Sequence, residues 1–302
     1  MKILITGGMG FIGMHLVKYL LKNGNKITIF DNFSNSDRKL IHSFENTKVD
    51  VIEGDITKNE EISNAIKNHD IVVHLAAKIS VNESIKNPQE TFHVNVDGTK
   101  NVLEACKKNN IKKLIVSSSA AVYGEGFPET KLKENMHTNP TSPYGKSKLN
   151  MEQEIEKYIL NHNNLDCIIL RFFNIFGSGQ SSTYAGVITK FIEKISMNKP
   201  IEIFGDGLQT RDFVSIDDVV KSIFDAIING KQGTYNIASG NTVTINQLAE
   251  LIMTLIGKNT IIRYMPARKG DIKFSAADIS LAEKEIKYVP KFSVEKIREL
   301  IQ

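Results

Sequence analysis

The chain has 302 residues, of which 41% are apolar and 24% charged, and its formal net charge is +4. This composition is ordinary for a globular protein of one large domain or two coupled ones. The small charge, without any long run of Lys or Arg, excludes a nucleic-acid-binding tail. No apolar run approaches the roughly 18 residues that cross a bilayer, and the first residues do not resemble a secretion signal. We therefore expect a cytoplasmic protein with no membrane and no nucleic-acid partner.

The first two-thirds of the chain alternate short apolar runs with amphipathic stretches. Near-continuous Val, Ile and Leu runs are typical of parallel strands buried on both faces. They predict strands at 2–6, 26–30, 49–54, 70–76, 113–119 and 167–173. The stretches between them predict helices at 11–23, 58–67, 89–109 and 144–161. Alternation of this length predicts an α/β fold with a Rossmann-like, doubly wound parallel sheet.

The pattern becomes less regular after residue 174. Short strands are expected at 201–204, 234–237 and 260–264, and helices at 184–197, 216–229, 244–257, 278–285 and 293–301. We predict a Rossmann domain at 1–173 and a smaller C-terminal α/β lobe at 174–302, with a segment near 212–238 returning to the first domain. No linker of low complexity separates the two, so they should enclose a cleft. Cys106 and Cys167 lie in apolar segments without nearby ligands, which favours buried free thiols over a metal site.

A glycine-rich turn follows the first strand. Gly7, Gly10 and Gly13 lie three residues apart where this strand meets a helix. Glycine permits a tight turn and a close approach of the backbone to a pyrophosphate, whose charge is stabilised at the helix N-terminus. Asp31 ends the second strand, where a carboxylate accepts hydrogen bonds from ribose hydroxyls and repels a 2′-phosphate. The pattern predicts NAD rather than NADP, although Asp31 alone would also fit a solvated strand end.

The third strand is followed by Asp55 and Ile56, near the place where an adenine edge would lie in such a site. Ile56 is expected to pack on the ring face. A simple turn with a helix cap is the alternative interpretation of both residues.

Tyr144 and Lys148 lie at the start of a predicted helix, four residues apart and therefore on one face. An ordinary Tyr, with a pKa near 10, is a poor base at neutral pH. A nearby ammonium and a positive nicotinamide ring both favour the phenolate, so we expect the pKa of Tyr144 to be lowered. Hydroxyls at 117–119 end the fifth strand, at the sheet edge where ligands bind. Alone, the Tyr–Lys pair would fit an ordinary helix surface.

Taken together, these motifs resemble the extended short-chain dehydrogenase/reductases, and among them the UDP-glucose 4-epimerase-like nucleotide-sugar enzymes. The resemblance covers nearly the whole chain. No single motif is specific, but the set is. The matching stretches are TGGMGFIG (6–13), DNFS (31–34), GDI (54–56), HLAA (74–77), VNVDGT (94–99), SSSAAVYG (117–124), SPYGKSK (142–148), LRFFNIFG (170–177), GDGLQTRDFVSIDDV (205–219) and PARKGDI (266–272).

The resemblance implies an enzyme with NAD as cofactor and a UDP-sugar as substrate. It implies a catalytic set of Ser119, Tyr144 and Lys148. Implied NAD contacts are Gly7, Gly10, Phe11, Ile12, Gly13, Asp31, Asn32, Asp55, Ile56, Leu75, Ala76, Ala77, Asn95, Ser117, Tyr144 and Lys148. Implied substrate contacts are Ser119, Asn174, Val187, Arg211, Arg268, Asp271 and Ser275, with the C-terminal lobe as the substrate-binding part. Without the resemblance, the two arginines would also fit surface ion pairs.

The residues after Ser119 bear on which reaction follows oxidation at C4. Similar 4,6-dehydratases carry an Asp-Glu pair there, whereas this chain has Ala120 and Ala121, which supply neither acid nor base for an elimination. We therefore expect C4 epimerisation of a UDP-hexose. Another dehydrogenase, reductase or decarboxylase of the family, or a non-catalytic NAD-binding regulator, are the alternatives. Lys78 departs from the family pattern, which more often has a neutral residue such as Gln.

Two further expectations come from the resemblance. Relatives pair two helices per subunit into a four-helix interface, and the helices at 89–109 and 144–161 carry apolar residues beyond one stripe, so we expect a homodimer. The alternative is that these residues face their own sheet. A small residue seven positions after Arg268, here Ser275, goes with acceptance of N-acetyl sugars, although Phe274 would be able to intrude.

Overall fold

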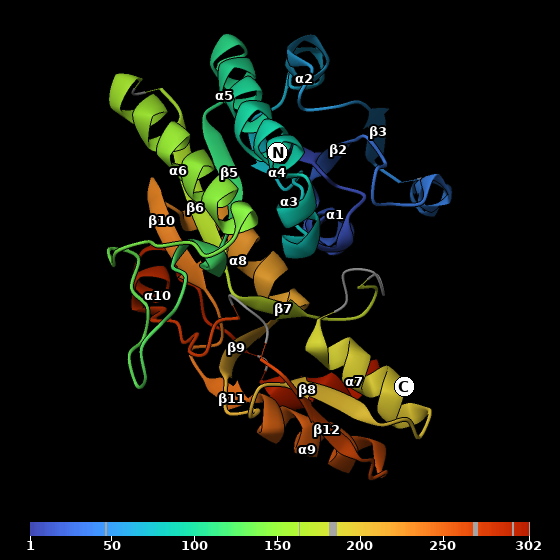
Figure 1. Ribbon diagram of the computed structural model, residues 1–302. Helices are drawn as coiled ribbons and strands as arrows, with labels where there is room; N and C mark the ends of the chain where they lie inside the picture. Colours follow the sequence, from blue (N-terminus) through green and yellow to red (C-terminus); the bar gives the residue numbers. More distant parts are fainter. Residues whose placement is uncertain (46, 163, 181–185, 268–270, 292, 302) are drawn as a thin grey trace.

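The computed structural model describes residues 1–302 except 46, 163, 181–185, 268–270, 292 and 302 (Figure 1). A seven-stranded parallel sheet has the order β10-β6-β5-β4-β1-β2-β3. The strand order reverses between β1 and β4, which is where an open α/β sheet binds its ligand. The Rossmann-like fold predicted from the sequence is therefore confirmed. The strands are β1 (Lys2–Thr6), β2 (Lys26–Asp31), β3 (Val49–Glu53), β4 (Ile71–His74), β5 (Lys113–Ser119), β6 (Asp166–Phe172) and β10 (Gly233–Ile237).

Helices cover both faces of this sheet because successive strand side chains point to opposite sides. Ile3 and Ile5 of β1 enter one core with α1 and α8, whereas Leu4 enters the other with α2, α5 and α6. Both faces are apolar, which explains the near-continuous hydrophobic runs in the sequence. The helices are α1 (Phe11–Lys22), α2 (Asn59–Ala65), α5 (Gly98–Lys108), α6 (Pro143–Asn161) and α8 (Ile216–Asn229).

The helix expected at 89–109 is present at 88–108, but one of its turns is not α-helical. It consists of α4 (Pro88–Phe92), a π-helical turn at His93–Asp97 and α5. The side chain of Asn95, buried in the π turn, bonds the main chain of Lys78 and the hydroxyl of Ser147. Such single π turns are frequent at functional sites. The polar contacts of one buried amide therefore explain why the regular helix is interrupted.

The C-terminal lobe contains two small sheets, one with the order β11-β9-β7 and one pairing β12 with β8. The lower part of Figure 1 shows α7 and α9 beside these strands. A separate apolar core joins both helices to β8. The smaller α/β lobe is thus confirmed, while the limits at 173 and 174 stay a prediction. The elements are β7 (Asn174–Phe176), α7 (Val187–Ser196), β8 (Ile201–Phe204), β9 (Thr210–Ser215), β11 (Thr242–Thr244), α9 (Ile245–Ile256) and β12 (Ile262–Met265). The helix α10 (Ser280–Ile286) instead packs into the core of the large sheet.

Several short elements were not predicted from the sequence. These are β7, β9 and β11, the helix α3 (Val81–Lys86) and the 3-10 segment Arg38–Phe44. The helix expected at 293–301 is a 3-10 segment, Val294–Leu300. Its preceding Ser293 gives its hydroxyl to Glu295 and so caps no backbone N–H. The part of the helix expected at 184–185 lies outside the described residues.

The apolar residues offered for a dimer interface are largely used within the subunit. Val102 and Leu103 of α5, and Met151, Ile155 and Tyr158 of α6, are buried in the core beneath their own sheet. The outer sides of these helices carry charges instead, such as Lys100 and Glu154, 3.8 Å apart. That part of the argument for a dimer was wrong, because the sheet covers more of each helix than one stripe. Among the described residues, no helix is long and apolar enough to cross a membrane.

Candidate active site

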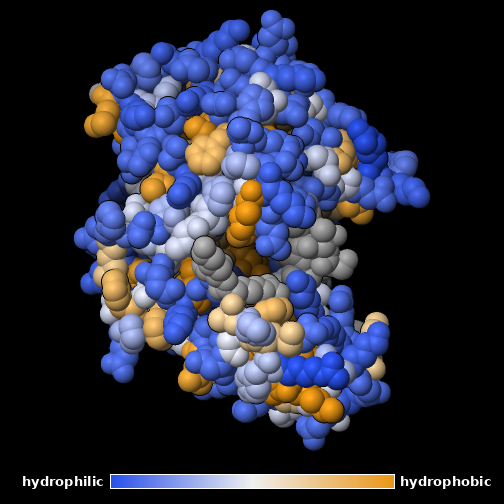
Figure 2. All heavy atoms as spheres, viewed as in Figure 1, coloured by the Kyte–Doolittle hydropathy of each residue, from blue (hydrophilic) through white to orange (hydrophobic). Residues whose placement is uncertain are grey.

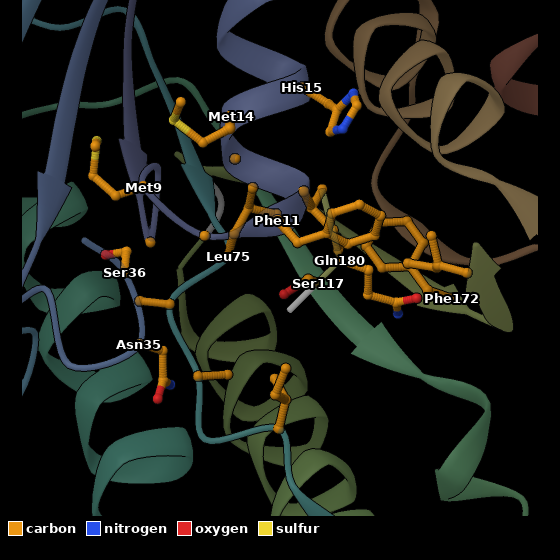
Figure 3. Close-up of a pocket in the computed structure, with 18 of the residues that line it drawn as sticks. Met9, Phe11, Met14, His15, Asn35, Ser36, Leu75, Ser117, Phe172 and Gln180 are labelled. Carbon is orange, nitrogen blue, oxygen red and sulfur yellow. The ribbon is translucent and has the colours of Figure 1, made fainter. Parts of the chain in front are cut away.

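A cleft of about 830 Å³ opens at the carboxyl ends of β1, β4 and β5. A hollow near the middle of the face in Figure 2 lies between the large sheet's helices and the C-terminal lobe. Figure 3 shows Phe11, Leu75, Ser117 and Phe172 around this space, with Ser36 and Asn35 below Met9 at the left of the view. The volume is suited to a ligand of cofactor size. The cleft therefore lies where the strand order predicts a dinucleotide.

The glycine turn is built for close backbone contact. Gly7 has φ +69°, and a Cβ atom there would lie 2.6 Å from the backbone nitrogen of Ala76. A Cβ on Gly13 would lie 2.6 Å from the carbonyl oxygen of Gly7. Gly10 immediately precedes α1 and caps it without a side chain. All three glycines line the cleft, so the turn leaves the N-terminus of α1 free to face an anion.

The Asp31 carboxylate shapes the loop beside this turn. Its two oxygens accept the backbone N–H groups of Met9, at 2.9 Å, and Phe33, at 2.8 Å. Burial raises the pKa of Asp31, and these backbone bonds oppose the rise. Asp31 lines the cleft, so the alternative of a solvated strand end does not describe it.

Asp55 and Ile56 differ in their positions. Asp55 accepts hydrogen bonds from the backbone and hydroxyl of Thr57 and from the side chain of Asn32. Burial raises the pKa of Asp55, but these bonds outweigh it and lower the pKa overall. Ile56 and Asn32 line the cleft, whereas Asp55 holds the turn from behind.

Other predicted cofactor residues surround the same space. Asn95 is buried behind the wall, where its amide bonds fix the loop that carries Lys78. The Lys78 ammonium pairs with Glu90 at 2.9 Å. The remaining predicted contacts line the cleft directly: Phe11, Ile12, Leu75, Ala76, Ala77, Ser117, Tyr144 and Lys148. Sequence reasoning missed further lining residues, including Met9, His15, Asn35, Ser36 and Asp37, of which the last three follow the DNF motif.

Ser119, Tyr144 and Lys148 converge on the cleft from two elements. Ser119 is the last residue of β5, and Tyr144 is the second residue of α6. Ser142 caps α6 by accepting the N–H of Gly145 at 3.1 Å. A Cβ on Gly145 would lie 2.6 Å from the carbonyl oxygen of Ala121, so only glycine lets α6 start this close to the end of β5. The result is that Ser119 and Tyr144 both line the cleft, where the Ser119 hydroxyl acts on the pKa of Tyr144.

The electrostatics around Tyr144 differ from the expectation. Burial raises the pKa of Tyr144, and the Ser119 hydroxyl opposes the rise. Lys148 is not among the groups of the chain that shift it, so the predicted lowering by Lys148 is not seen. The Lys148 ammonium instead donates to the carbonyl oxygen of Ser117 at 2.8 Å. Burial lowers the pKa of Lys148 to about 8, and the charge of Glu152 opposes this.

The predicted substrate residues do not all lie in one place. Asn174 and Val187 line the cleft. Arg211 lines an adjoining pocket of about 350 Å³ that shares Phe213 with the cleft, and its guanidinium bonds Asp271 at 2.8 Å. Ser275 is buried and is not among the residues that line either space. Arg268 lies outside the described residues. Within the described part of the chain, no cluster of three His, Cys, Asp or Glu residues is placed to hold a metal ion.

The parallel sheet, the glycine turn and the Ser119–Tyr144–Lys148 cluster define a dinucleotide-binding protein of the Rossmann class. More narrowly, the chain belongs to the NAD dependent epimerase/dehydratase family, whose model matches residues 3–238. It is an NAD-dependent enzyme of that family, as the motifs indicated. The close backbone approach at Gly7 and the carboxylate of Asp31 fit this cofactor.

Three relatives illustrate the likeness. A putative UDP-glucose 4-epimerase of Methanocaldococcus jannaschii is 38% identical to this chain. The match covers 93% of this chain and 91% of the relative. The UDP-glucose 4-epimerase of Thermotoga maritima, solved with UDP-glucose, superposes with a TM-score of 0.93, 33% identity and coverage of 100% and 97%. The UDP-N-acetylglucosamine 4-epimerase of Methanobrevibacter ruminantium, solved with UDP-N-acetylmuramic acid, has a TM-score of 0.91, 37% identity and coverage of 99% and 95%.

Proposed function

We propose that the chain epimerises UDP-hexoses at C4, interconverting UDP-glucose and UDP-galactose. The observation that carries the proposal is the convergence of Ser119, Tyr144 and Lys148 on one cleft with the glycine turn. NAD bound in that cleft supplies a reversible acceptor for the hydrogen at C4. The domain that holds NAD is residues 1–173, and residues 174–302 mainly hold the nucleotide sugar.

The protein's own groups handle the proton. Tyr144 as phenolate removes the proton of the sugar 4-hydroxyl, and Ser119 holds that hydroxyl through a hydrogen bond. The positive charge of the oxidised nicotinamide favours the phenolate, because it attracts the negative charge. Lys148 lines the same cleft, and its ammonium is held there by the Ser117 carbonyl. The 4-keto sugar then turns about its diphosphate and is reduced on the opposite face, with Tyr144 returning the proton.

The alternatives share the scaffold but need other groups. Elimination requires an additional acid and base, and Ala120 and Ala121 provide neither beside Ser119. A dehydrogenase, reductase or oxidative decarboxylase that releases its product changes the cofactor's redox state, which absorbance near 340 nm reports. A non-catalytic NAD-binding regulator would convert no sugar at all. Product analysis after incubation with UDP-glucose and UDP-galactose separates these outcomes, because only an epimerase reaches one equilibrium mixture from both substrates.

We further propose that N-acetyl sugars are accepted, which the name of the M. ruminantium relative supports. Ser275 is buried and does not itself line the cleft, so a phenol ring at this position would have to displace its surroundings, and overpacking costs roughly 1–3 kcal/mol. Ser275→Tyr should lower kcat/KM for UDP-N-acetylglucosamine while sparing UDP-glucose. An unchanged ratio would show that this buried serine is not the gate, and Phe274→Ala then tests its neighbour.

A homodimer is proposed through a four-helix contact of α5 and α6, using their exposed sides. Leu160 on α6 has 84% of its surface exposed, which suits a contact with a second copy. Light scattering at micromolar concentration should give twice the mass of the 33.8 kDa chain. A monomeric mass contradicts this part of the proposal.

A further inference from the structure

Glu152 lies one helical turn after Lys148 on α6 and is 1% exposed. Its carboxylate accepts hydrogen bonds from Arg171, at 3.0 Å from Nε and 2.7 Å from Nη2. It also accepts the hydroxyl of Ser118, the residue between Ser117 and Ser119 on β5. Two side-chain contacts therefore join α6 to β5, because Lys148, one turn before Glu152 on α6, donates to the Ser117 carbonyl of β5.

Arg171 secures the far side of this carboxylate. It lies on β6, paired in register with Ser118, and it is nearly fully buried. Its Nη1 donates to the Tyr123 hydroxyl at 2.9 Å and to the Glu134 carbonyl at 3.1 Å. A buried ion pair is often no more stabilising than a well-packed apolar pair, because desolvation offsets the attraction. Its presence beside the catalytic helix therefore calls for a role other than stability.

The surroundings of Lys148 suggest that role. On α6, Tyr144 lies one turn before Lys148 and Glu152 one turn after it. The carbonyl of Ser117 faces Lys148 from β5 and the imidazole of His74 from β4, with Arg171 behind Glu152 on β6. His74 is neutral at pH 7, because burial first and the Lys148 charge second lower its pKa to about 3. Of these groups, Glu152 supplies the negative charge that opposes the loss of the Lys148 proton by burial.

We propose that Glu152 is a positioning residue that keeps Lys148 charged and held against the end of β5, with Ser118 and Arg171 fixing its carboxylate. Lys148 lines the cleft, so a neutral Lys148 removes a positive charge from the reaction site, and loss of the Glu152 charge narrows the pH range of turnover. This consequence for catalysis rests on the proposed epimerase function, but the protonation of Lys148 does not.

The test measures the titration midpoint of Lys148 in two ways, directly by NMR and through the pH dependence of turnover. Lysine side chains labelled with 13C at Cε are titrated by NMR in the NAD-bound protein, with Lys148→Arg identifying the signal. The alkaline limb of the kcat profile for UDP-galactose is recorded in parallel. Glu152→Gln should move both midpoints to lower pH by on the order of one unit. Glu152→Asp keeps the charge and should recover most of this change.

Tyr123→Phe is the matched control, because it removes one partner of Arg171 and leaves the Glu152 charge in place. It should lower the melting temperature without moving either midpoint. If Glu152→Gln fails to fold, the double variant Glu152→Gln/Arg171→Gln removes both charges and should still titrate below wild type. A Lys148 midpoint unchanged in the folded single or double variant, or moved equally by Tyr123→Phe, overturns the inference. If the wild type epimerises nothing while the NMR midpoint still moves, the proposed function fails and the role of Glu152 stands.

Discussion

Gly145 at the start of α6 lies against Ala121 just after β5, so closely that a Cβ atom on Gly145 would lie 2.6 Å from the carbonyl oxygen of Ala121. The contact depends on backbone rather than side-chain chemistry, since the helix approaches this closely only because position 145 is glycine. The fold itself thereby brings Ser119 and Tyr144, the two residues of the proposed proton path, to the same cleft.

Removal of the Tyr144 hydroxyl is the direct test of that path. Tyr144→Phe should lower kcat by roughly 10²–10⁴-fold, because it deletes the proton acceptor, while NAD affinity changes little. Tyr158→Phe is the control, since Tyr158 lies buried on the same helix and its hydroxyl has no hydrogen-bond partner among the residues that the structure describes. Turnover should be unaffected in the control. Near wild-type turnover in Tyr144→Phe would refute the assignment.

Gly7 should be intolerant of any side chain. Gly7→Ala adds left-handed backbone strain and a Cβ 2.6 Å from the Ala76 nitrogen, so both stability and NAD affinity should fall. Gly24 is the matched control, because it has φ +76° and open space around its missing Cβ. Gly24→Ala should cost only the strain, about 1–2 kcal/mol, without affecting NAD binding. Equal NAD affinities in the two variants would contradict the close approach at Gly7.

Asp31 should set the choice of cofactor. A carboxylate beside a 2′-phosphate is repulsive, so calorimetry should give NAD a dissociation constant at least about tenfold below that of NADP. Asp31→Asn should weaken the binding of both NAD and NADP, because it disturbs the Met9 and Phe33 contacts. It should also narrow the ratio of the two dissociation constants. Asp50→Asn, an exposed change on β3, should leave the ratio unchanged. Equal dissociation constants in the wild type would rule the assignment out.

His74 should make the fold sensitive to acid. Thr99 gives its proton to the Asn95 carbonyl and so accepts from His74 Nε2, while Nδ1 faces the Thr6 hydroxyl. The folded pKa of His74, about 3, is below the unfolded value near 6.5. Unfolded chains therefore bind the extra proton between these pH values, and the stabilising contribution present above pH 6.5 is lost as pH falls toward 3.

The variant His74→Gln isolates this effect from Asp212, whose folded pKa of about 6, raised by burial, acts in the opposite direction between pH 4 and 6. At pH 7 the variant should be less stable by roughly 1–3 kcal/mol through lost hydrogen bonds. The difference in unfolding free energy should shrink by about 1.4 kcal/mol per pH unit below 6.5. If the denaturation midpoints of the wild type and of His74→Gln changed in parallel across this pH range, a neutral buried His74 would be excluded.

Local patterns predicted the parts of the site that local chemistry determines. The apolar strands, the glycine turn and the Tyr144–Lys148 spacing each appear in a few adjacent residues, and the fold brings them together as expected. Contacts between distant residues left no such pattern. The amide of Asn95 interrupts a regular helix, Arg211 pairs with Asp271, and Glu152 looks in the sequence like any exposed helix glutamate. Each of these depends on tertiary neighbours that periodicity does not encode.

The fate of the C4 hydrogen tests the central claim most directly. UDP-galactose is incubated with the NAD-bound protein in D₂O, and the products are analysed by NMR and mass spectrometry. The account predicts UDP-glucose that retains its original hydrogen at C4, with no deuterium from solvent, because that hydrogen leaves the sugar and returns to it without contacting water. Absence of UDP-glucose, or UDP-glucose carrying solvent deuterium at C4, would contradict it.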